Sequence, residues 1–173
     1  YRTLETAILI LRLARIKDSR LQNNKKADKF FNLLSKIAQY DFSKLSFTGK
    51  TVVTVEGLEG SGKSTVIHNI AKYTPDLEVI SAKTIPIVAD MYEIFQLLPQ
   101  SVQRAYQHVI NYIIAYHIIH SNNSMFLIEN YYHYVCAQNI TDRTNSLDSI
   151  YELPNSVFDW PYDLPLPELV SKF

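Results

Sequence analysis

One short stretch constrains the fold of this chain more than any other. Residues 51–65 read TVVTVEGLEGSGKST and contain the pattern G-x-x-x-x-G-K-[ST], formed by Gly57, Gly62, Lys63 and Ser64. The residues ahead of the pattern, 51–55, are all β-branched, as expected of a buried parallel strand. Apolar residues behind it, at 66, 67, 70 and 71, have helical spacing. A strand, a glycine loop and a helix in this order predict a phosphate-binding loop.

The residue types of the loop suit a polyphosphate. Three of the four glycines in the chain, Gly57, Gly60 and Gly62, lie here. Without a Cβ atom they permit positive φ and a close approach of the backbone, so that successive N–H groups can form an anion-binding nest. We expect Lys63 to reach the β- and γ-phosphates of a nucleoside triphosphate and the hydroxyl of Ser64 to bind Mg²⁺.

The charge of the chain is unevenly distributed. Its formal net charge is zero, but residues 1–50 hold 11 Lys/Arg against 4 Asp/Glu, and residues 51–173 hold 6 against 13. A basic arm could bind nucleic acid or anionic lipid. The basic residues are scattered among leucines and isoleucines, however, and we therefore expect a solvated helix face and no nucleic-acid partner.

Length and apolar patterning favour one compact α/β domain with a helical extension. No run reaches the 18 apolar residues of a membrane-spanning helix, and Arg12 interrupts the apolar run 7–11, so we expect no membrane partner. The lone Cys136 excludes an internal disulfide and suits a reducing compartment.

The periodicity predicts the remaining elements. Residues 4–16 and 26–40 are expected to form amphipathic helices of an N-terminal extension, residues 1–45, ahead of a domain over 46–173. Within that domain we expect strands at 51–55, 77–80 and 125–128 and helices at 65–72, 88–98 and 100–120. Strands that alternate with helices predict a parallel sheet.

Glu129 is a second candidate for the site. It directly follows the apolar run Met125–Ile128, which places a carboxylate at the carboxyl end of a predicted parallel strand. Open parallel sheets bind ligands at that end, where the glycine loop also lies. Glu129 could bind Mg²⁺ directly or through water. The alternative is a carboxylate that caps the next helix.

The predicted helix over 100–120 has a polar stripe. Arg104, His108 and Asn111 are spaced by four and three residues and share one helix face. The stripe could hold a ligand, since Arg104 is one of few cations late in the chain and a monophosphate needs a guanidinium. It could equally face solvent. We interpret His117 and His120 as residues of the helix surface and not as metal ligands, because no third ligand is apparent.

Several segments together resemble the thymidylate kinase-like nucleoside monophosphate kinases, and within them the mitochondrial UMP-CMP kinases. The resemblance covers roughly residues 28–173. It is carried by the segments VEGLEGSGKST (55–65), Pro99 with Arg104-Ala-Tyr106 and NYIIA (111–115), LIENYYH (127–133) and VFDWPYDLPLPEL (157–169).

The resemblance implies a three-layer P-loop NTPase fold with a parallel sheet, and transfer of a phosphoryl group from ATP, with Mg²⁺, to a pyrimidine nucleoside monophosphate such as CMP, UMP, dCMP, dUMP or dTMP. Catalytic roles would fall to Lys63, Glu59, which would stand near the acceptor phosphate, and Arg104. Mg²⁺ would be held by Ser64 and Glu129. ATP would be held by Gly57, Leu58, Glu59, Gly60, Ser61, Gly62, Lys63, Ser64 and Thr65, and the acceptor by Arg104, Asn111, Tyr112 and Tyr132.

Two departures from the family pattern suggest an alternative. The chain has Glu129-Asn130-Tyr131 where the family usually has Asp-Arg before an aromatic residue. Residues 83–98 also lack the arginine and acid that the family has around a Phe-Asp pair, and offer Tyr92, Phe95 and Gln96 instead. A catalytically impaired nucleotide-binding or regulatory protein of the same fold is therefore a second hypothesis. The resemblance also implies a mitochondrial location, with a cytoplasmic one as alternative, and a homodimer. We expect the fold to be incomplete at the C-terminus, because residues 167–170 resemble the start of a further family strand.

Overall fold

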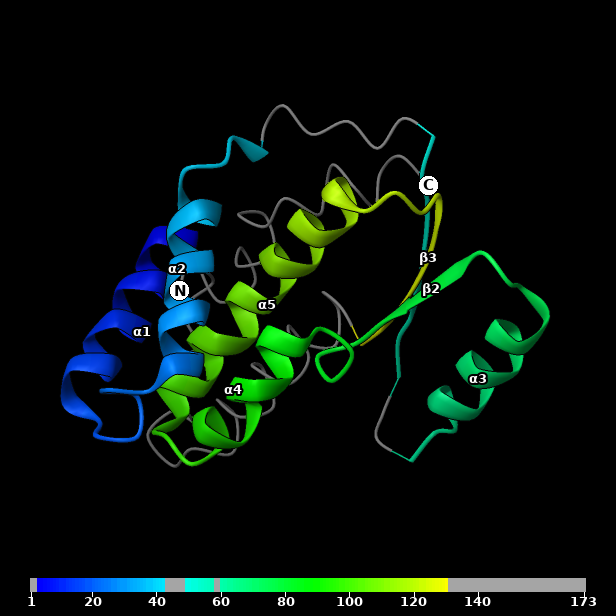
Figure 1. Cartoon of the computed structure of the whole chain (residues 1–173). Coiled ribbons are helices and arrows are strands. Elements are labelled where there is room, and N and C mark those ends of the chain that lie inside the picture. The colour runs from blue at the N-terminus through cyan, green and yellow to red at the C-terminus, as the bar shows by residue number, and fades with distance from the viewer. Residues whose placement is uncertain (1–2, 43–48, 58–59, 131–173) are drawn as a thin grey trace, which may run out of the picture.

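The computed structural model of this protein describes residues 3–42, 49–57 and 60–130. This part of the chain is a mixed α/β structure, which confirms the predicted class. In chain order its elements are α1 (Leu4–Lys17), α2 (Lys25–Ala38), β1 (Thr51–Val55), α3 (Lys63–Tyr73), β2 (Leu77–Ile80), α4 (Pro86–Gln96), α5 (Gln100–His120) and β3 (Met125–Glu129). Figure 1 shows their arrangement.

The three described strands form one open parallel sheet in the order β1-β3-β2. β3 lies in the middle and pairs with a strand on each side. The parallel direction predicted from the alternation of strands and helices is confirmed. Because the strands run the same way, they end along one edge, at Val55, Ile80 and Glu129, which we call the carboxyl edge. The opposite edge, where they begin, is the amino edge.

The two faces of the sheet are covered by different helices. Figure 1 shows α1, α2, α4 and α5 on one side of the sheet and α3 on the other. Alternate strand residues point to opposite faces. Val52, Phe126 and Ile128 belong to the main hydrophobic core with the four helices, whereas Leu127, on the other face, is buried outside that cluster. We call the four helices the helical layer.

Three aromatic rings lie in the centre of the helical layer. The rings of Phe95 and Tyr106 stack with centroids 4.3 Å apart, and Phe30 lies 5.5 Å from the first and 5.7 Å from the second. Such pairs add about 0.5–1.5 kcal/mol each beyond their burial. The Tyr106 hydroxyl donates to the carbonyl of Val88 over 2.7 Å. Burial raises the pKa of Tyr106, so its hydroxyl remains protonated.

Local signals explain where the helices begin. The structure confirms the predicted bounds of two strands, 51–55 and 77–80, and of the helix 100–120. α2 begins one residue earlier than predicted, because the Asn24 side chain accepts hydrogen bonds from two N–H groups of its first turn. α4 begins two residues earlier, at Pro86, whose missing N–H is not needed there. α3 begins at Lys63, two residues earlier than predicted, after a left-handed Gly62.

β1 is less buried than its sequence predicts. Val52 is 5% exposed, but Val53 is 50% exposed, and so is Val66 of α3. Within the described sheet β1 pairs on one side only, and α3 packs mainly on β2 and β3. The prediction of a buried strand is therefore wrong for one face of β1, because burial depends on which elements cover a strand.

The two N-terminal helices share the core of the other described elements. α1 packs on α5, and α2 packs on α4 and α5. Most of their basic side chains are exposed, as predicted, and Lys26 forms an ion pair of 2.6 Å with Asp90 of α4. The domain boundary near residue 45 stays a prediction. Across the described ranges, none of the helices combines the length and apolar character that a membrane crossing requires.

Candidate functional site

The glycine loop and Glu129 are neighbours at the carboxyl edge. The glycine loop, residues 56–62, leaves β1 after Val55 and leads into α3. Val55 lies opposite Glu129 in the register of β1 and β3. The fold thus brings together two segments that are far apart in the sequence, at the edge where open parallel sheets bind ligands.

A hydrogen bond joins α3 to β3 at this site. The Ser64 hydroxyl donates to Oε1 of Glu129 over 2.7 Å. Among the described residues, the Glu129 carboxylate has no other hydrogen-bond partner. Two oxygen groups of the kind that Mg²⁺ prefers therefore meet at one point, with further lone pairs left on the carboxylate. These are the two residues that the sequence predicts as metal ligands.

Lys63 is buried although it carries a charge. Its residue is 9% exposed, and its Nζ donates to the carbonyl of Gly57 over 2.9 Å. An ammonium group is expensive to bury unless it is hydrogen-bonded. The contact with Gly57 keeps the charge of Lys63 at the glycine loop, where the sequence predicts a polyphosphate.

The shape of the loop depends on its three glycines. A Cβ atom at position 57 would lie 3.1 Å from Oγ of Ser61 and 3.5 Å from Cδ of Lys63. A side chain at Gly57 would therefore crowd the loop from within. Gly60 and Gly62 have φ values of 76° and 84°, in the left-handed region that favours glycine, and Gly62 is the N-cap of α3.

The N-terminus of α3 differs from those of α1 and α2. Thr3 and Asn24 cap α1 and α2 with their side chains, and an acidic residue follows in each first turn. α3 follows Gly62 with no side-chain cap and no acidic residue in its first turn, and α4 and α5 begin in the same way. Of these three helices, α3 is the one that follows the glycine loop, where the positive end of its dipole would favour an anion such as a phosphate.

Some predicted site residues fall outside the part of the chain that the structure describes. Leu58, Glu59 and Tyr132 lie outside the described residues, as does the segment 157–169. The described remainder of the predicted ATP site, Gly60, Ser61 and Thr65, is exposed.

Asn130 continues β3 past Glu129 in an unusual backbone conformation. Its φ is 55°, and its N–H donates to the carbonyl of Val55 over 3.1 Å. Its side-chain Oδ1 is buried and has no hydrogen-bond partner among the described residues. The sequence identified Asn130 as the position of a lost arginine but gave no signal for this conformation.

The polar stripe on α5 is mostly buried. His108 is 2% exposed and Asn111 is 1% exposed, so the solvent-facing alternative is wrong for both, while Arg104 is half-buried. Tyr112 is 4% exposed, and its ring lies 5.2 Å from that of Phe42. Burial on this scale makes the stripe part of the interior of the helical layer.

Burial lowers the pKa of His108 from 6.5 to about 4. Its ring is therefore neutral at pH 7. Since the unfolded chain binds the proton more tightly, this histidine makes the folded state less stable as the pH falls from 6.5 toward 4.

Arg104 lies near the start of α5, and α5 belongs to the helical layer, across the sheet from α3 (Figure 1). Arg104 precedes His120, the last residue of the helix, by about 24 Å at 1.5 Å per residue. Its membership of one site with the glycine loop stays a prediction.

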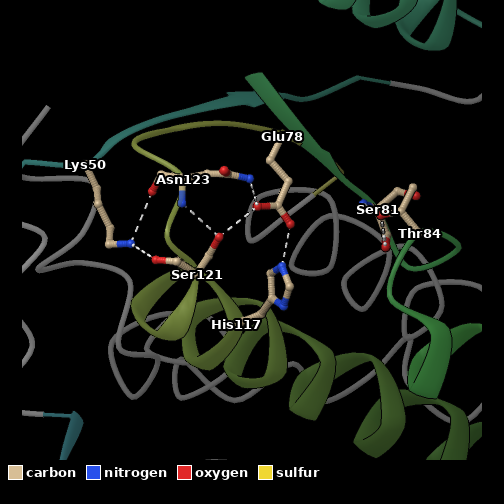
Figure 2. A network of polar contacts seen from close by, with 7 residues as sticks. All are labelled: Lys50, Glu78, Ser81, Thr84, His117, Ser121 and Asn123. Carbon is tan, nitrogen blue, oxygen red and sulfur yellow. Dashed lines mark hydrogen bonds and ion pairs between the residues drawn. The ribbon is translucent and has the colours of Figure 1, made fainter. Parts of the chain in front are cut away.

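A second polar cluster occupies the amino edge, and sequence reasoning missed it. Figure 2 shows the Glu78 carboxylate of β2 facing His117, Ser121 and Asn123. Oε1 lies 2.5 Å from Nε2 of His117, and Oε2 accepts hydrogen bonds of 3.0 Å from Ser121 and 2.7 Å from Asn123. Nζ of Lys50 donates to the carbonyls of Ser121, over 2.6 Å, and Asn123, over 3.3 Å.

This amino-edge cluster fixes the turn between α5 and β3 against the starts of β1 and β2. Although burial acts in the opposite direction, the hydrogen bonds from His117, Asn123 and Ser121 lower the pKa of Glu78. His117 is therefore more than the surface residue that the sequence predicts. The available signal was Glu78 itself, a charged residue inside the apolar strand LEVI.

Comparison of this chain with protein-family models, with curated proteins and with solved structures gives no match. The functional argument therefore rests on the residues and on their geometry.

Proposed function

We propose that this chain binds ATP with Mg²⁺ at the carboxyl edge and transfers the γ-phosphoryl group to a pyrimidine nucleoside monophosphate, in a P-loop NTPase fold. The observation that carries the proposal is the hydrogen bond between Ser64 and Glu129. It unites a hydroxyl from the end of the glycine pattern with a carboxylate from the middle strand, which is the pairing that a Mg²⁺–nucleotide site requires.

Three features of the chain fit a bound Mg²⁺–ATP. The Ser64 hydroxyl and the Glu129 carboxylate supply oxygen ligands on neighbouring elements. Gly57 lies where a Cβ would crowd Ser61 and the stem of Lys63. The first turn of α3 lacks a side-chain cap and an acidic residue, and so favours an anion. When bound, Mg²⁺ would neutralise charge on the β- and γ-phosphates.

The proposed roles of the chain's own groups follow from their positions. N–H groups of the glycine loop and of the first turn of α3 would bind the phosphates. Lys63 would exchange its bond to Gly57 for the oxygens of the β- and γ-phosphates. A phosphate oxygen of the acceptor would attack the γ-phosphorus, and the bond to the β–γ bridging oxygen would break, so that ADP leaves. Chemistry of this type depends on positioning and charge stabilisation.

The acceptor class rests on the family resemblance of the α5 segment. In this proposal the guanidinium of Arg104 would contact the acceptor phosphate. Asn111 and Tyr112 would shape the acceptor pocket. Glu59 and Tyr132 keep their predicted roles in this proposal, as do the homodimer and the mitochondrial location.

A nucleotide-binding protein without transferase activity is the second candidate. Asn130 favours it, because asparagine occupies the position where the family usually has an arginine and an amide cannot supply that charge. The loss of one charged phosphate contact, about 1.5–3 kcal/mol, would slow transfer by about 10- to 150-fold.

Two measurements on the full chain separate these functions. Titration with a fluorescent ATP analogue, with Mg²⁺ and with EDTA, tests nucleotide binding. Conversion of labelled ATP to ADP in the presence of CMP, UMP, dCMP, dUMP or dTMP tests transfer. We expect Mg²⁺-dependent binding and a diphosphate product from at least one acceptor. Binding without any product would support the second candidate, and absence of binding would contradict both.

A further inference from the structure

Three exposed apolar side chains lie in a row on α1. Leu9, Leu13 and Ile16 are 56%, 47% and 69% exposed, and their spacing of four and three residues places them on one face of the helix. The opposite face of α1 is buried in the core. Single exposed leucines are common on protein surfaces, but an apolar row bordered by polar residues is typical of a surface that contacts a partner.

Basic residues border this row on both sides. Arg12 and Lys17 are exposed, and the helical period places them on opposite sides of the row. The Arg12 guanidinium donates to Oγ of Ser35 on α2 over 3.2 Å, and Arg15 forms an ion pair with Asp28 of α2. These contacts place α2 directly beside α1, and Figure 1 shows both helices on the side of the helical layer that faces away from the sheet.

α2 adds a row of lysines to the same outer surface. Lys25, Lys29 and Lys36 are exposed and lie on the face of α2 opposite its buried side chains. None of the three forms an ion pair with a residue in the described ranges. Glu5 of α1 is an exposed acid close to the apolar row, but the cations outnumber it. The α1–α2 surface, as we call it, consists of Leu9, Leu13, Ile16, Lys25, Lys29 and Lys36.

The combination of apolar and basic side chains restricts the partner. A nucleic acid would neutralise the lysines but leave the apolar row in water. A purely apolar protein surface would cover the row but provide no counter-charge for the lysines. At an anionic bilayer, apolar side chains enter the boundary between headgroups and acyl chains, while the long basic side chains extend to the lipid phosphates. Each cation near such a surface strengthens binding about fivefold.

The exposure of the apolar row changes the interpretation of the basic arm. Because leucines and isoleucines separate its basic residues, the sequence predicts a solvated helix face. The structure shows that Leu9, Leu13 and Ile16 are exposed beside those basic residues, which a solvated face does not explain. Contact with one leaflet of a bilayer needs an exposed amphipathic surface and no membrane-spanning helix.

We propose that the α1–α2 surface binds an anionic phospholipid bilayer. Leu9, Leu13 and Ile16 insert at the level of the headgroups, and the lysines of α2 contact the lipid phosphates. The proposal is independent of nucleotide binding, because neither the glycine loop nor α3 contributes a residue to this surface.

Sedimentation of the full chain with lipid vesicles tests the proposal. Vesicles of phosphatidylcholine with about one third phosphatidylserine are compared with vesicles of phosphatidylcholine alone. We expect the chain to bind the anionic vesicles at least about tenfold more tightly. An increase from about 0.1 M to about 0.5 M salt should weaken this binding about tenfold, because salt screens charges at the surface.

One pair of variants tests the apolar row. Ile16→Gln should weaken binding to the anionic vesicles about tenfold, because a polar side chain replaces one that enters the bilayer. Ile70→Gln is the matched control, since Ile70 is an exposed isoleucine of α3, across the sheet from the α1–α2 surface.

A second set of variants tests the lysines. Lys29→Gln combined with Lys36→Gln should weaken binding to the anionic vesicles about 25-fold, or about fivefold for each lysine. Lys72→Gln combined with Lys83→Gln removes the same number of exposed lysines outside α1 and α2, and should have a much smaller effect.

The other outcomes are also decisive. No binding of the wild type to anionic vesicles would overturn the proposal and favour an acidic protein as partner. Equal losses in the variants and in their controls would overturn it too, because another surface or the net charge would then be responsible. A DNA duplex that bound as tightly as the vesicles, unaffected by Ile16→Gln, would favour a nucleic acid instead.

Two further measurements keep these results separate from loss of the fold and from the proposed function. Thermal unfolding of each variant shows whether it folds, and the lysine variants still test the proposal if Ile16→Gln does not. A chain that binds anionic vesicles but no nucleotide would contradict the proposed function alone, and a chain that binds nucleotide but no vesicles would contradict the lipid proposal alone.

Discussion

The two edges of the sheet each carry a carboxylate on a strand, and the two carboxylates have different surroundings. At the amino edge, Glu78 contacts His117, Ser121 and Asn123. At the carboxyl edge, Glu129 accepts one hydrogen bond among the described residues, from Ser64, and Asn130 next to it has an unpaired oxygen. A carboxylate with satisfied lone pairs fixes structure, whereas one with free lone pairs can still receive a ligand.

The two faces of the sheet also differ, in how completely their side chains are buried. The helical layer encloses three aromatic rings and the buried hydroxyl of Tyr106. On the other face, Val53 and Val66 are half exposed. The amino edge and the helical layer thus stabilise the fold, and the glycine loop with α3 forms its open side. Substitutions at the two edges should therefore affect different measurements.

The largest effect is expected from Lys63→Ala at the carboxyl edge. Removal of the ammonium should weaken ATP binding about 100-fold, or about 2.7 kcal/mol, because this charge would face the β- and γ-phosphates. Stability should change little, since the Lys63 ammonium bonds to its own loop at Gly57. Nucleotide titration and thermal unfolding measure the two effects. Lys72→Ala, at an exposed lysine of the same helix, is the control.

Glu78→Gln should lower the free energy of unfolding by about 1–2 kcal/mol, because the charged acceptor of three hydrogen bonds becomes neutral. ATP affinity should remain unchanged. Urea denaturation compares this variant with Glu93→Gln, at an exposed carboxylate of α4. If nucleotide affinity fell together with stability, the two edges would not be independent.

Glu129→Gln should show the opposite pattern. The glutamine carbonyl can still accept the Ser64 hydroxyl, so stability should stay within about 0.5 kcal/mol of wild type. The Mg²⁺-dependent part of ATP affinity should fall about tenfold, or about 1.4 kcal/mol, because a neutral oxygen binds the cation more weakly. A loss of stability as large as that of Glu78→Gln would show that Glu129 has a structural role instead.

The smallest effect concerns the pH dependence of stability. The pKa of Glu78 is lowered in the folded state, so its stabilisation is present above 4.5, its ordinary value, and is lost as the pH falls through the folded pKa. The difference in unfolding free energy between wild type and Glu78→Gln should therefore shrink below pH 4.5. Urea titrations at pH 5.5 and 3.5 measure it, and the buried His108 contributes equally to both proteins. A constant difference would contradict the assignment.

Residues with strong local signals were predicted well. The β-branched run 51–55 and the apolar spacing along 100–120 gave the bounds of β1 and α5, because both patterns are properties of neighbouring residues. The loop pattern also predicted a glycine with positive φ just before the helix, and Gly62, with φ 84° directly ahead of Lys63, confirms it. The exposure of Val53 was not predictable in this way, since it depends on which elements lie beside β1 and over it.

By itself, the sequence determined the α/β class, the parallel direction of the strands and the composition of the glycine loop, because these follow from local periodicity and from the conformational freedom of glycine. Only the tertiary structure decided that β3 lies between β1 and β2, and this order brings Ser64 to Glu129 and Asn130 to Val55. It also decided that Glu78 has three hydrogen-bond partners, whereas Glu129 has one among the described residues. The reason is that the partners of a carboxylate come from distant segments, which only long-range packing brings within hydrogen-bond distance.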